Sequence, residues 1–201
     1  MNKVLILFAH PRFEQSRTNS QLVAAIPKNE HITFHDLYEH YPNFHIDIER
    51  EKALLEAHDI IIWHHPLYWY SAPPLIKQWI DMVLEFGWAY GPGGKALEGK
   101  IIFNVITSGG TREVYNREGR NRFTIREFLA PFEQTVRLCH MDYLPPFAVQ
   151  GTHLLAPEQL KAATQNYAQL LLRLVETKPK IKALQKLEYL NDWFEKDAVS
   201  A

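Results

Sequence analysis

Cysteine, net charge and long hydrophobic runs are all scarce in this sequence, and each scarcity argues against a class of protein. The single cysteine among 201 residues, Cys139, cannot form an internal disulfide, which fits a reducing compartment. Lys and Arg (22) nearly balance Asp and Glu (23), which argues against a nucleic-acid-binding surface. No apolar run approaches the roughly 18 residues of a membrane-spanning helix, and the N-terminal run is too short for a signal peptide. We therefore expect a cytoplasmic protein.

Two common nucleotide-binding signatures are also missing. Neither G-x-G-x-x-G nor G-x-x-x-x-G-K-S/T occurs, which argues against a standard dinucleotide fold and a P-loop. Hydrophobic residues (46%) and charged residues (22%) are present in the proportions of an ordinary globular domain. The length is that of one domain with a full core.

Short buried-strand patterns alternate with segments of helical periodicity. The predicted strands are 4–8, 31–37, 60–63, 101–106 and 141–149, the last interrupted by two prolines. Five helices are predicted: one that ends before Pro27, one over 48–57, one that begins at Pro73, one over 124–139 and one that begins at Ala156. This alternation predicts an α/β, flavodoxin-like three-layer sandwich with a five-stranded parallel sheet of order 2-1-3-4-5.

Several segments carry more specific expectations. Residues 38–47 have no clean period and are predicted to form a loop. The third strand should stop at His64-His65-Pro66, because proline lacks a ladder donor. The two histidines should point to opposite faces of the strand, so we predict no metal site there. In the 124–139 helix the expected core contacts, followed by an inert buried thiol at Cys139, are Phe128, Phe132, Val136 and Leu138.

The C-terminal segment differs in character from the rest. We expect a flavodoxin-like domain over residues 1–177 and a helical tail over 178–201, with an apolar and aromatic stripe between residues 181 and 194. The sequence leaves open whether this tail docks on the body, docks on a partner or frays.

The loop after the first strand has the composition of a phosphate site. His10, Ser16, Thr18 and Asn19 come at the start of a helix, where hydroxyls, backbone N–H groups and the positive end of the helix dipole converge.

Two further loops complete a candidate site at the carboxyl ends of the strands. After the third strand, Tyr68, Trp69 and Tyr70 suit a flat, conjugated ligand, although such rings can also simply cap the core. After the fourth strand, the glycines of residues 107–111 allow close approach of the backbone to a ligand edge. A phosphate at one end and a planar heterocycle at the other describe a flavin nucleotide.

These motifs together resemble a known family. AHPRFEQSRTN, DLYEHYPNFHIDI, HHPLYWYSAPPLIKQWID, FGWAYGPGGKALEGK and TSGGT are similar to motifs of the flavodoxin-like NAD(P)H quinone oxidoreductases of DT-diaphorase type, over residues 3 to about 175. The small bacterial ancillary subunits of glutathione-gated potassium efflux systems are the most similar members. The resemblance implies a homodimer with flavin sites at the subunit interface. It also implies a cytoplasmic protein that can be peripheral at the inner face of the membrane through an antiporter partner.

The family's roles transfer to this chain by position. The phosphate would be held by His10, Ser16, Arg17, Thr18 and Asn19. The isoalloxazine would be lined by Pro66, Leu67, Tyr68, Trp69 and Tyr70 on one side, and by Thr107, Ser108, Gly109 and Gly110 on the other. Tyr115 matches a tyrosine that helps a histidine stabilise the reduced flavin. That histidine would fall at Asn121, which can donate a hydrogen bond but cannot carry a charge. Either Tyr115 therefore works with a different partner or the loop is shifted.

The resemblance also implies the reaction. Hydride would pass from NAD(P)H through FMN, with FAD as the alternative flavin, to a quinone in a ping-pong sequence. Trp69 and Trp88 would suit both nicotinamide and quinone rings. The alternatives are a regulatory ancillary subunit of a potassium efflux antiporter and a one-electron flavodoxin, which the near-neutral charge disfavours. Four arginines lie near Tyr115: Arg112, Arg117, Arg120 and Arg122. They either contact the negative charge of the reduced flavin or of NADPH, or form a solvent-exposed face.

Overall fold

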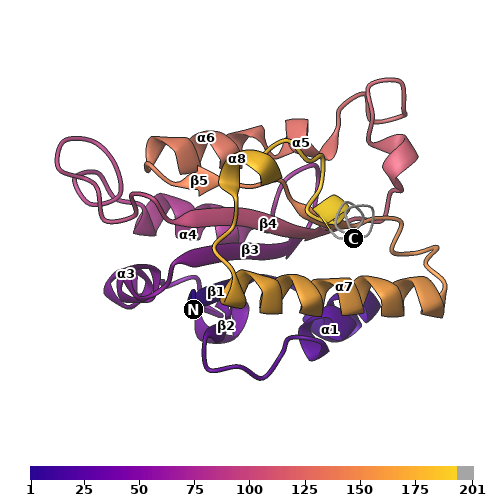
Figure 1. Cartoon of the computed structure of the whole chain (residues 1–201), viewed down its shortest axis with the longest axis horizontal. Helices are drawn as coiled ribbons and strands as arrows, with labels where there is room; N and C mark the ends of the chain where they lie inside the picture. The colour runs from indigo at the N-terminus through magenta and orange to yellow at the C-terminus, as the bar shows by residue number, and fades with distance from the viewer. Residues whose placement is uncertain (194–201) are drawn as a thin grey trace.

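A parallel β-sheet forms the centre of the computed structural model, which describes residues 1–193 (Figure 1). Strands β1 (Val4–Phe8), β2 (Ile32–Asp36), β3 (Ile60–Pro66), β4 (Ile101–Thr107) and β5 (Asp142–Tyr143) lie in the order β2-β1-β3-β4-β5. A further strand, β6 (Phe147–Val149), also pairs with β4 in parallel. The predicted flavodoxin-like order is therefore confirmed, and the last predicted strand is two short strands interrupted by Leu144-Pro145-Pro146.

Alternate residues of the central strands face two separate cores. Leu5, Leu7 and Trp63 point into one core and Val4, Ile6 and Ile62 into the other, and all are fully buried. The first core is covered by α3 (Ile48–Ala57), α4 (Pro74–Val83), α5 (Ile125–Phe128) and α6 (Ala130–Leu138). The second core is covered by α1 (Arg17–Ala24), α7 (Pro157–Glu176) and α8 (Ile181–Leu184). Figure 1 shows α1 and α7 on one side of the sheet and α6 on the other.

Four local predictions need correction. The strand predicted over 31–37 ends at Asp36, and helix α2 (Leu37–His40) lies in the predicted loop, because the Asp36 side chain accepts the N–H groups of Tyr38 and Glu39 and so caps a helix. The predicted 124–139 helix is divided into α5 and α6 at Leu129, where a proline follows in the first turn of α6. Leu138 is 52% exposed, because it lies about 200° around the helix from buried Val136.

The fourth correction concerns the end of β3. The sequence predicts that the strand ends at Trp63, before His64-His65-Pro66, but it continues through Pro66 because β4 pairs with it that far. On the other side, β1 pairs with it only as far as His64. Beyond that residue the side of β3 facing β1 carries no ladder, so the missing N–H of proline leaves no bond broken.

The described part of the tail packs against the body. Leu184, Leu187 and Leu190 are buried in the second core, and residues 185–191 between the leucines are not helical. The Asn191 side chain pairs with the backbone of Ala148 in both directions, accepting its N–H (2.9 Å) and donating to its carbonyl oxygen (3.1 Å). Residues 194–201 of the predicted tail lie outside the described residues. Docking on the body is thus the alternative that residues 178–193 adopt.

A buried carboxylate joins the helices of the first core. Glu51 of α3 accepts hydrogen bonds from His35 Nε2 (2.8 Å), the Tyr41 hydroxyl (2.5 Å) and Trp79 Nε1 of α4 (2.7 Å). Burial alone would raise the pKa of Glu51, but these three donors outweigh it and lower the pKa below its ordinary value.

None of the helices within residues 1–193 is both long enough and apolar enough to span a bilayer.

Candidate functional site

A cavity of about 500 Å³ opens at the carboxyl ends of the strands. Loops after β1, β3, β4 and β6 surround it, as expected for the ligand crevice of an open parallel sheet. Its lining residues are His10, Arg12, Gln15, Ser16, Arg17, Thr18, Asn19, Pro66, Leu67, Tyr68, Thr107, Gly109, Thr152 and His153.

The polar end of the cavity is the N-terminus of α1. Ser16 is the N-cap residue, and its side chain accepts the N–H of Asn19 (3.2 Å). The first N–H groups of a helix have no acceptor within the helix, so the N–H groups of Arg17 and Thr18 remain as donors at this end. Arg17 also donates to the carbonyl oxygens of Thr152 (3.3 Å) and Leu155 (2.8 Å), which holds the loop before α7 against α1. This arrangement suits an anion.

Asn19 orients two hydroxyl groups of the cavity. Its Nδ2 donates to Ser16 Oγ (2.9 Å) and to Thr107 Oγ1 (3.0 Å), and its Oδ1 accepts from His64 Nε2 (3.2 Å). His64 Nδ1 in turn accepts from the Tyr167 hydroxyl (3.2 Å). Because Asn19 occupies acceptor positions on both oxygens, the protons of Ser16 and Thr107 are free to donate into the cavity.

Both histidines nearest this network are held neutral by burial. Burial, followed by the nearby His65 and His10, lowers the pKa of His64 to about 3. Burial also lowers the pKa of His10, whose Nδ1 accepts the N–H of Arg12 (3.1 Å). The His10 proton therefore sits on Nε2, where it is a donor.

The aromatic loop after β3 contains a strained tight turn. Tyr68 and Ser71 exchange both backbone hydrogen bonds (3.1 and 3.0 Å), and the two residues between them have positive φ angles, 48° at Trp69 and 64° at Tyr70. Turns of this kind ordinarily use Asn and Gly, because bulky side chains are disfavoured there. Trp69 is 92% exposed, so the strain presents a large ring to solvent. Such strain is characteristic of ligand sites.

The loop after β4 depends on its glycines. A Cβ at Gly109 would lie 2.8 Å from His153 Nε2. A Cβ at Gly110 would lie 2.8 Å from both Tyr115 Cε2 and Val114 Cγ2. Ser108 is buried and its hydroxyl donates to the carbonyl oxygen of Gly110 (2.9 Å). The glycines thus allow a tightly folded loop against the cavity.

Tyr115 lies beside the cavity loops rather than in the cavity lining. It is buried, and its ring packs edge-on against Phe128, which stacks on Tyr70 (ring centroids 4.9 Å apart). Burial, and then the neighbouring Tyr70, raises the pKa of Tyr115. Asn121 is brought next to this turn, since its N–H donates to the carbonyl oxygen of Val114 (3.0 Å).

Among the described residues, two of the four candidate arginines have carboxylate partners. Arg112 pairs with Glu188 of the tail and stacks over Tyr189 (4.8 Å). Arg117 pairs with Glu127 (2.9 Å). These contacts favour a structural role for both residues.

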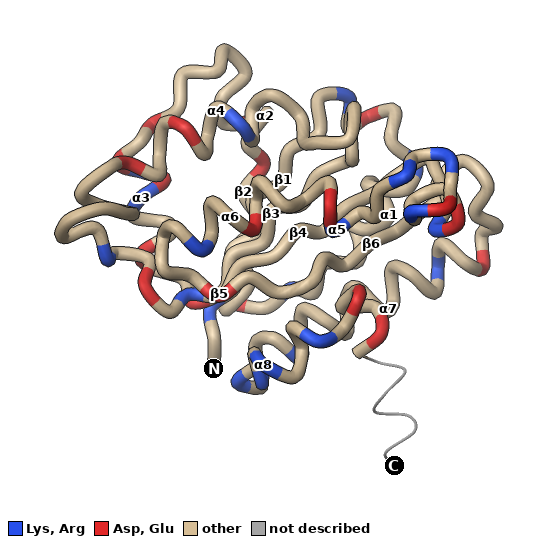
Figure 2. Tube along the Cα trace, turned by 90° about the horizontal axis from the view of Figure 1, so that it is seen from above, with Lys and Arg blue, Asp and Glu red and all other residues tan. Residues whose placement is uncertain are grey.

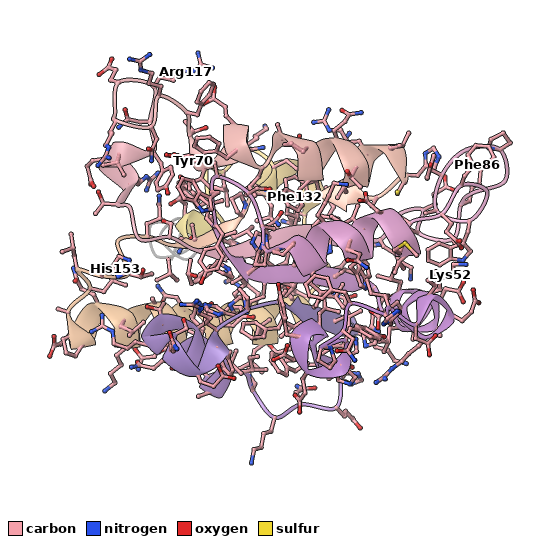
Figure 3. All side chains as sticks on the ribbon, turned by 180° about the vertical axis from the view of Figure 1, so that it is seen from behind. Lys52, Tyr70, Phe86, Arg117, Phe132 and His153 are labelled. Carbon is pink, nitrogen blue, oxygen red and sulfur yellow. The ribbon has the colours of Figure 1, made fainter. Side chains whose placement is uncertain are left out.

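The structure brings most of the predicted residues to one place. Ten of the fifteen predicted cofactor contacts line the cavity, and the other five adjoin it in the same loops or turns: Trp69, Tyr70, Ser108, Gly110 and Tyr115. Trp88, in contrast, donates to Glu56 (3.0 Å) and lies under Lys52, away from this cavity. Figure 3 shows Lys52 and Phe86 at the opposite end of the molecule from Tyr70 and His153.

Four residues that line the cavity are not among those predicted from the sequence: Arg12, Gln15, Thr152 and His153. The first two lie in the predicted phosphate loop and could have been included by position. Thr152 and His153 follow β6, so the rule that ligands bind at carboxyl ends of strands was the available signal.

The adjacent histidines serve opposite cores. His64 contacts Asn19 and Tyr167, whereas His65 contacts the Pro66 carbonyl oxygen (3.0 Å) and Asn104 (2.9 Å). Within residues 1–193, no cluster of three or more His, Cys, Asp and Glu side chains is placed to hold a metal ion. Cys139 is buried, and burial raises its pKa to about 11.

The sheet order and the cavity at its carboxyl end define an α/β protein of flavodoxin type. The chain belongs to the flavodoxin-like fold family Flavodoxin_2, which it matches over residues 2–173. Its expected resemblance to the quinone oxidoreductases and their ancillary relatives is thereby confirmed.

Individual relatives are similar over nearly their whole length. The glutathione-regulated potassium-efflux system ancillary protein KefG of Yersinia enterocolitica is 46% identical over 169 residues, covering 84% of this chain and 92% of that protein. General stress protein 14 of Treponema denticola, solved in complex with FMN, is 38% identical with a TM-score of 0.81, covering 86% of this chain and 99% of that one. An NADPH-quinone reductase from P. pentosaceus is 36% identical with a TM-score of 0.77, covering 84% and 97%.

Proposed function

We propose that this protein is an FMN-dependent NAD(P)H:quinone oxidoreductase. The observation that carries the proposal is the set of donors at the N-terminus of α1, next to a cavity walled by the loops after β3 and β4. The FMN-bound relative supports FMN as the cofactor, and the relative named as an NADPH-quinone reductase supports the reaction.

The residues present fit a flavin mononucleotide. Ser16 and Thr107 have hydroxyl protons available, Arg17 and Thr18 have backbone N–H groups, and His10 has Nε2–H. All these donors suit a phosphate and its ribityl chain. The residues that would line the ring are those predicted from the sequence: Pro66, Leu67, Tyr68, Trp69 and Tyr70 on one side, with the backbone of Thr107, Ser108, Gly109 and Gly110 on the other. The Thr107 hydroxyl, which shares Asn19 Nδ2 with Ser16, would serve the phosphate end instead.

When bound, the flavin supplies the redox chemistry, accepting hydride from the reduced nicotinamide and passing two electrons to the quinone. The protein's own contribution is position, donors and a shielded surface. Tyr115 stays protonated at neutral pH, because burial raises its pKa, and its hydroxyl can donate to charge that develops on a neighbouring group. Asn121 is our proposed partner for Tyr115, as a donor without charge.

We further propose that two copies of the chain form the working unit. Trp69 (92%) and Phe123 (54%) near the cavity expose large rings to solvent, and Phe86 (68%) does so at the other end. Exposed rings of this size favour association, and a second copy would shield the open cavity from water.

The similarity to KefG favours a second function. We propose that the protein also serves as an ancillary, regulatory subunit of a glutathione-gated potassium efflux antiporter. It would then work in the cytoplasm, at the inner face of the membrane, through that partner. Flavin reduction and partner regulation are compatible in one chain.

A visible spectrum of the purified protein, before and after anaerobic NADPH, tests the enzyme. We expect a flavin band that NADPH bleaches by two electrons, released cofactor that is FMN, and reoxidation by added quinone. A protein that stays colourless after incubation with FMN and FAD would refute the proposal. A flavin that NADPH reduces but quinone does not reoxidise would refute the acceptor and leave the ancillary function.

A further inference from the structure

A second cavity, which we call the tail pocket, lies between the end of α7 and the tail that follows it. Its volume is about 540 Å³. Because α7 has 20 residues, its ends lie about 30 Å apart. The flavin cavity is at the N-terminal end of α7, where Thr152 and His153 line it, and the tail pocket is at the other end. A ligand in the tail pocket would therefore leave the flavin cavity open.

The walls of the tail pocket are strongly cationic. Arg173, Lys178, Lys180 and Lys186 line it, and none of its lining residues within 1–193 is a carboxylate. None of the ion pairs found in residues 1–193 includes any of the three lysines, all of which are exposed. Figure 2 shows basic residues along and beside α8. Clustered like charges repel one another, so an anion is the ligand that this pocket stabilises.

The interior of the tail pocket is apolar. Leu184 and Leu187 are buried at its base, and Trp193 forms a wall with the Arg173 guanidinium 4.7 Å from its ring centroid. An inorganic anion would gain nothing from these groups. A ligand that carries both carboxylates and an aliphatic side chain would use both parts of the pocket.

The shape of the tail argues for a protein ligand rather than a bilayer. Proteins that lie on membranes insert large hydrophobic side chains between the lipids. Between residues 178 and 193 no large hydrophobic side chain is exposed; the leucines are turned inward to the core. The cations thus surround a concave pocket instead of flanking an inserting ridge.

We propose that the tail pocket binds an acidic segment of a partner protein, with its carboxylates on Lys178, Lys180 and Lys186 and an aliphatic side chain against Trp193 and the leucines. The family match ends at residue 173, so most of the pocket wall is additional to the matched flavodoxin-like region. The site therefore extends the proposed ancillary function with a surface separate from the flavin cavity.

Binding of a synthetic heptapeptide, Glu-Asp-Leu-Glu-Asp-Leu-Glu, to the full-length flavin-loaded protein tests the proposal. Fluorescence anisotropy of the labelled peptide at an ionic strength of about 0.1 M, where the Debye length is about 10 Å, should show saturable binding. The triple variant Lys178→Glu, Lys180→Glu, Lys186→Glu should weaken it by at least about tenfold, or more than about 1.4 kcal/mol. The triple Lys→Arg variant at these positions should retain binding, because the charges remain.

A matched variant separates the pocket from overall charge. Lys28→Glu, Lys95→Glu, Lys161→Glu changes three exposed lysines elsewhere and gives the same net charge. Its peptide affinity should stay within about threefold of the wild type, since exposed charges beyond a Debye length are screened. Equal losses in the two triple variants would refute a defined site.

Three other results would also overturn the proposal. One is no binding by the wild-type protein. A second is a lysine-dependent preference for phosphatidylglycerol vesicles over the peptide, which would assign the pocket to lipid. The third is a tenfold or greater gain in peptide affinity on deletion of residues 194–201, which contain Glu195 and Asp197, because this acidic segment would then be the occupant. The readout uses neither NADPH nor quinone, so its outcome is independent of the oxidoreductase proposal.

Discussion

Replacing Asn19 by Asp tests the role of the hydroxyl donors at the end of the cavity. The two side chains have the same shape, but Asp accepts hydrogen bonds and donates none. The hydroxyls of Ser16 and Thr107, which now accept from Asn19 Nδ2 (2.9 and 3.0 Å), would turn to donate to the new carboxylate. The fold should survive, since every group keeps a partner. The cavity would lose two donors and gain a negative charge.

The size of the effect follows from these two changes. Two charge-assisted hydrogen bonds to a phosphate are together worth about 3 kcal/mol. Two unit charges of like sign about 7 Å apart repel by about 2.4 kcal/mol at an effective dielectric constant of about 20, which sets the scale of the added repulsion per phosphate charge. Allowing for relaxation, we expect FMN to bind at least about a hundredfold more weakly to the Asn19→Asp variant.

Quenching of flavin fluorescence on titration of the apoprotein measures this affinity. Riboflavin lacks the phosphate, so its affinity should change little, and the ratio of the FMN and riboflavin affinities is the decisive quantity. Asn29→Asp is a matched control, because that side-chain oxygen only accepts the N–H of His31 (2.9 Å), which Asp can do equally well. An unchanged ratio in the Asn19→Asp variant would refute the assignment of this end of the cavity to phosphate.

Three other substitutions have direct expectations. Glu51→Gln should lower the free energy of unfolding by about 2–3 kcal/mol, or roughly 5–10 °C in Tm, because an amide cannot accept from all three buried donors. The control Glu49→Gln changes an exposed residue and should alter this free energy by under about 0.5 kcal/mol. Because the pKa of Glu51 is lowered on folding, its stabilisation holds at neutral pH and is lost in acid, so the gap between wild type and Glu51→Gln in thermal scans should narrow as pH falls through that pKa. Trp69→Gly should raise stability by about 0.5–1 kcal/mol by relieving positive-φ strain while weakening flavin or substrate binding; a stability loss in urea unfolding would contradict this. Tyr115→Phe should slow flavin reduction by NADPH in stopped flow, and equal rates would show that its hydroxyl has no role.

The central strands β1 and β3 could be predicted from sequence because they are buried on both faces. Residues such as Ile60 and Ile61 enter different cores, so these strands begin as continuous apolar runs. The phosphate loop was equally accessible, since an N-cap Ser followed by Thr and Asn is a local signal. These features depend on neighbouring residues alone.

Features that depend on distant contacts were less accessible. The leucines of the tail are spaced by three and resembled a helix stripe, but burial against the sheet holds most of the segment in another conformation. His153 joined the cavity only because Gly109 lets two distant loops meet. The exposed arginines gave no signal to distinguish ion pairing within the chain from ligand binding.

The pairing of Asn191 with Ala148 also bears on how copies of this chain behave in solution. Strand β6 pairs with β4 on one side, so its outer side is an open sheet edge on which another extended chain could add. The Asn191 amide occupies the N–H and carbonyl groups of Ala148, and the Leu190 N–H takes the Pro146 carbonyl oxygen (2.9 Å). The tail thereby protects that edge from β-aggregation. A protein truncated after residue 177 would retain the residues of the flavin cavity and the flavodoxin-like sheet, but it would aggregate more readily in solution.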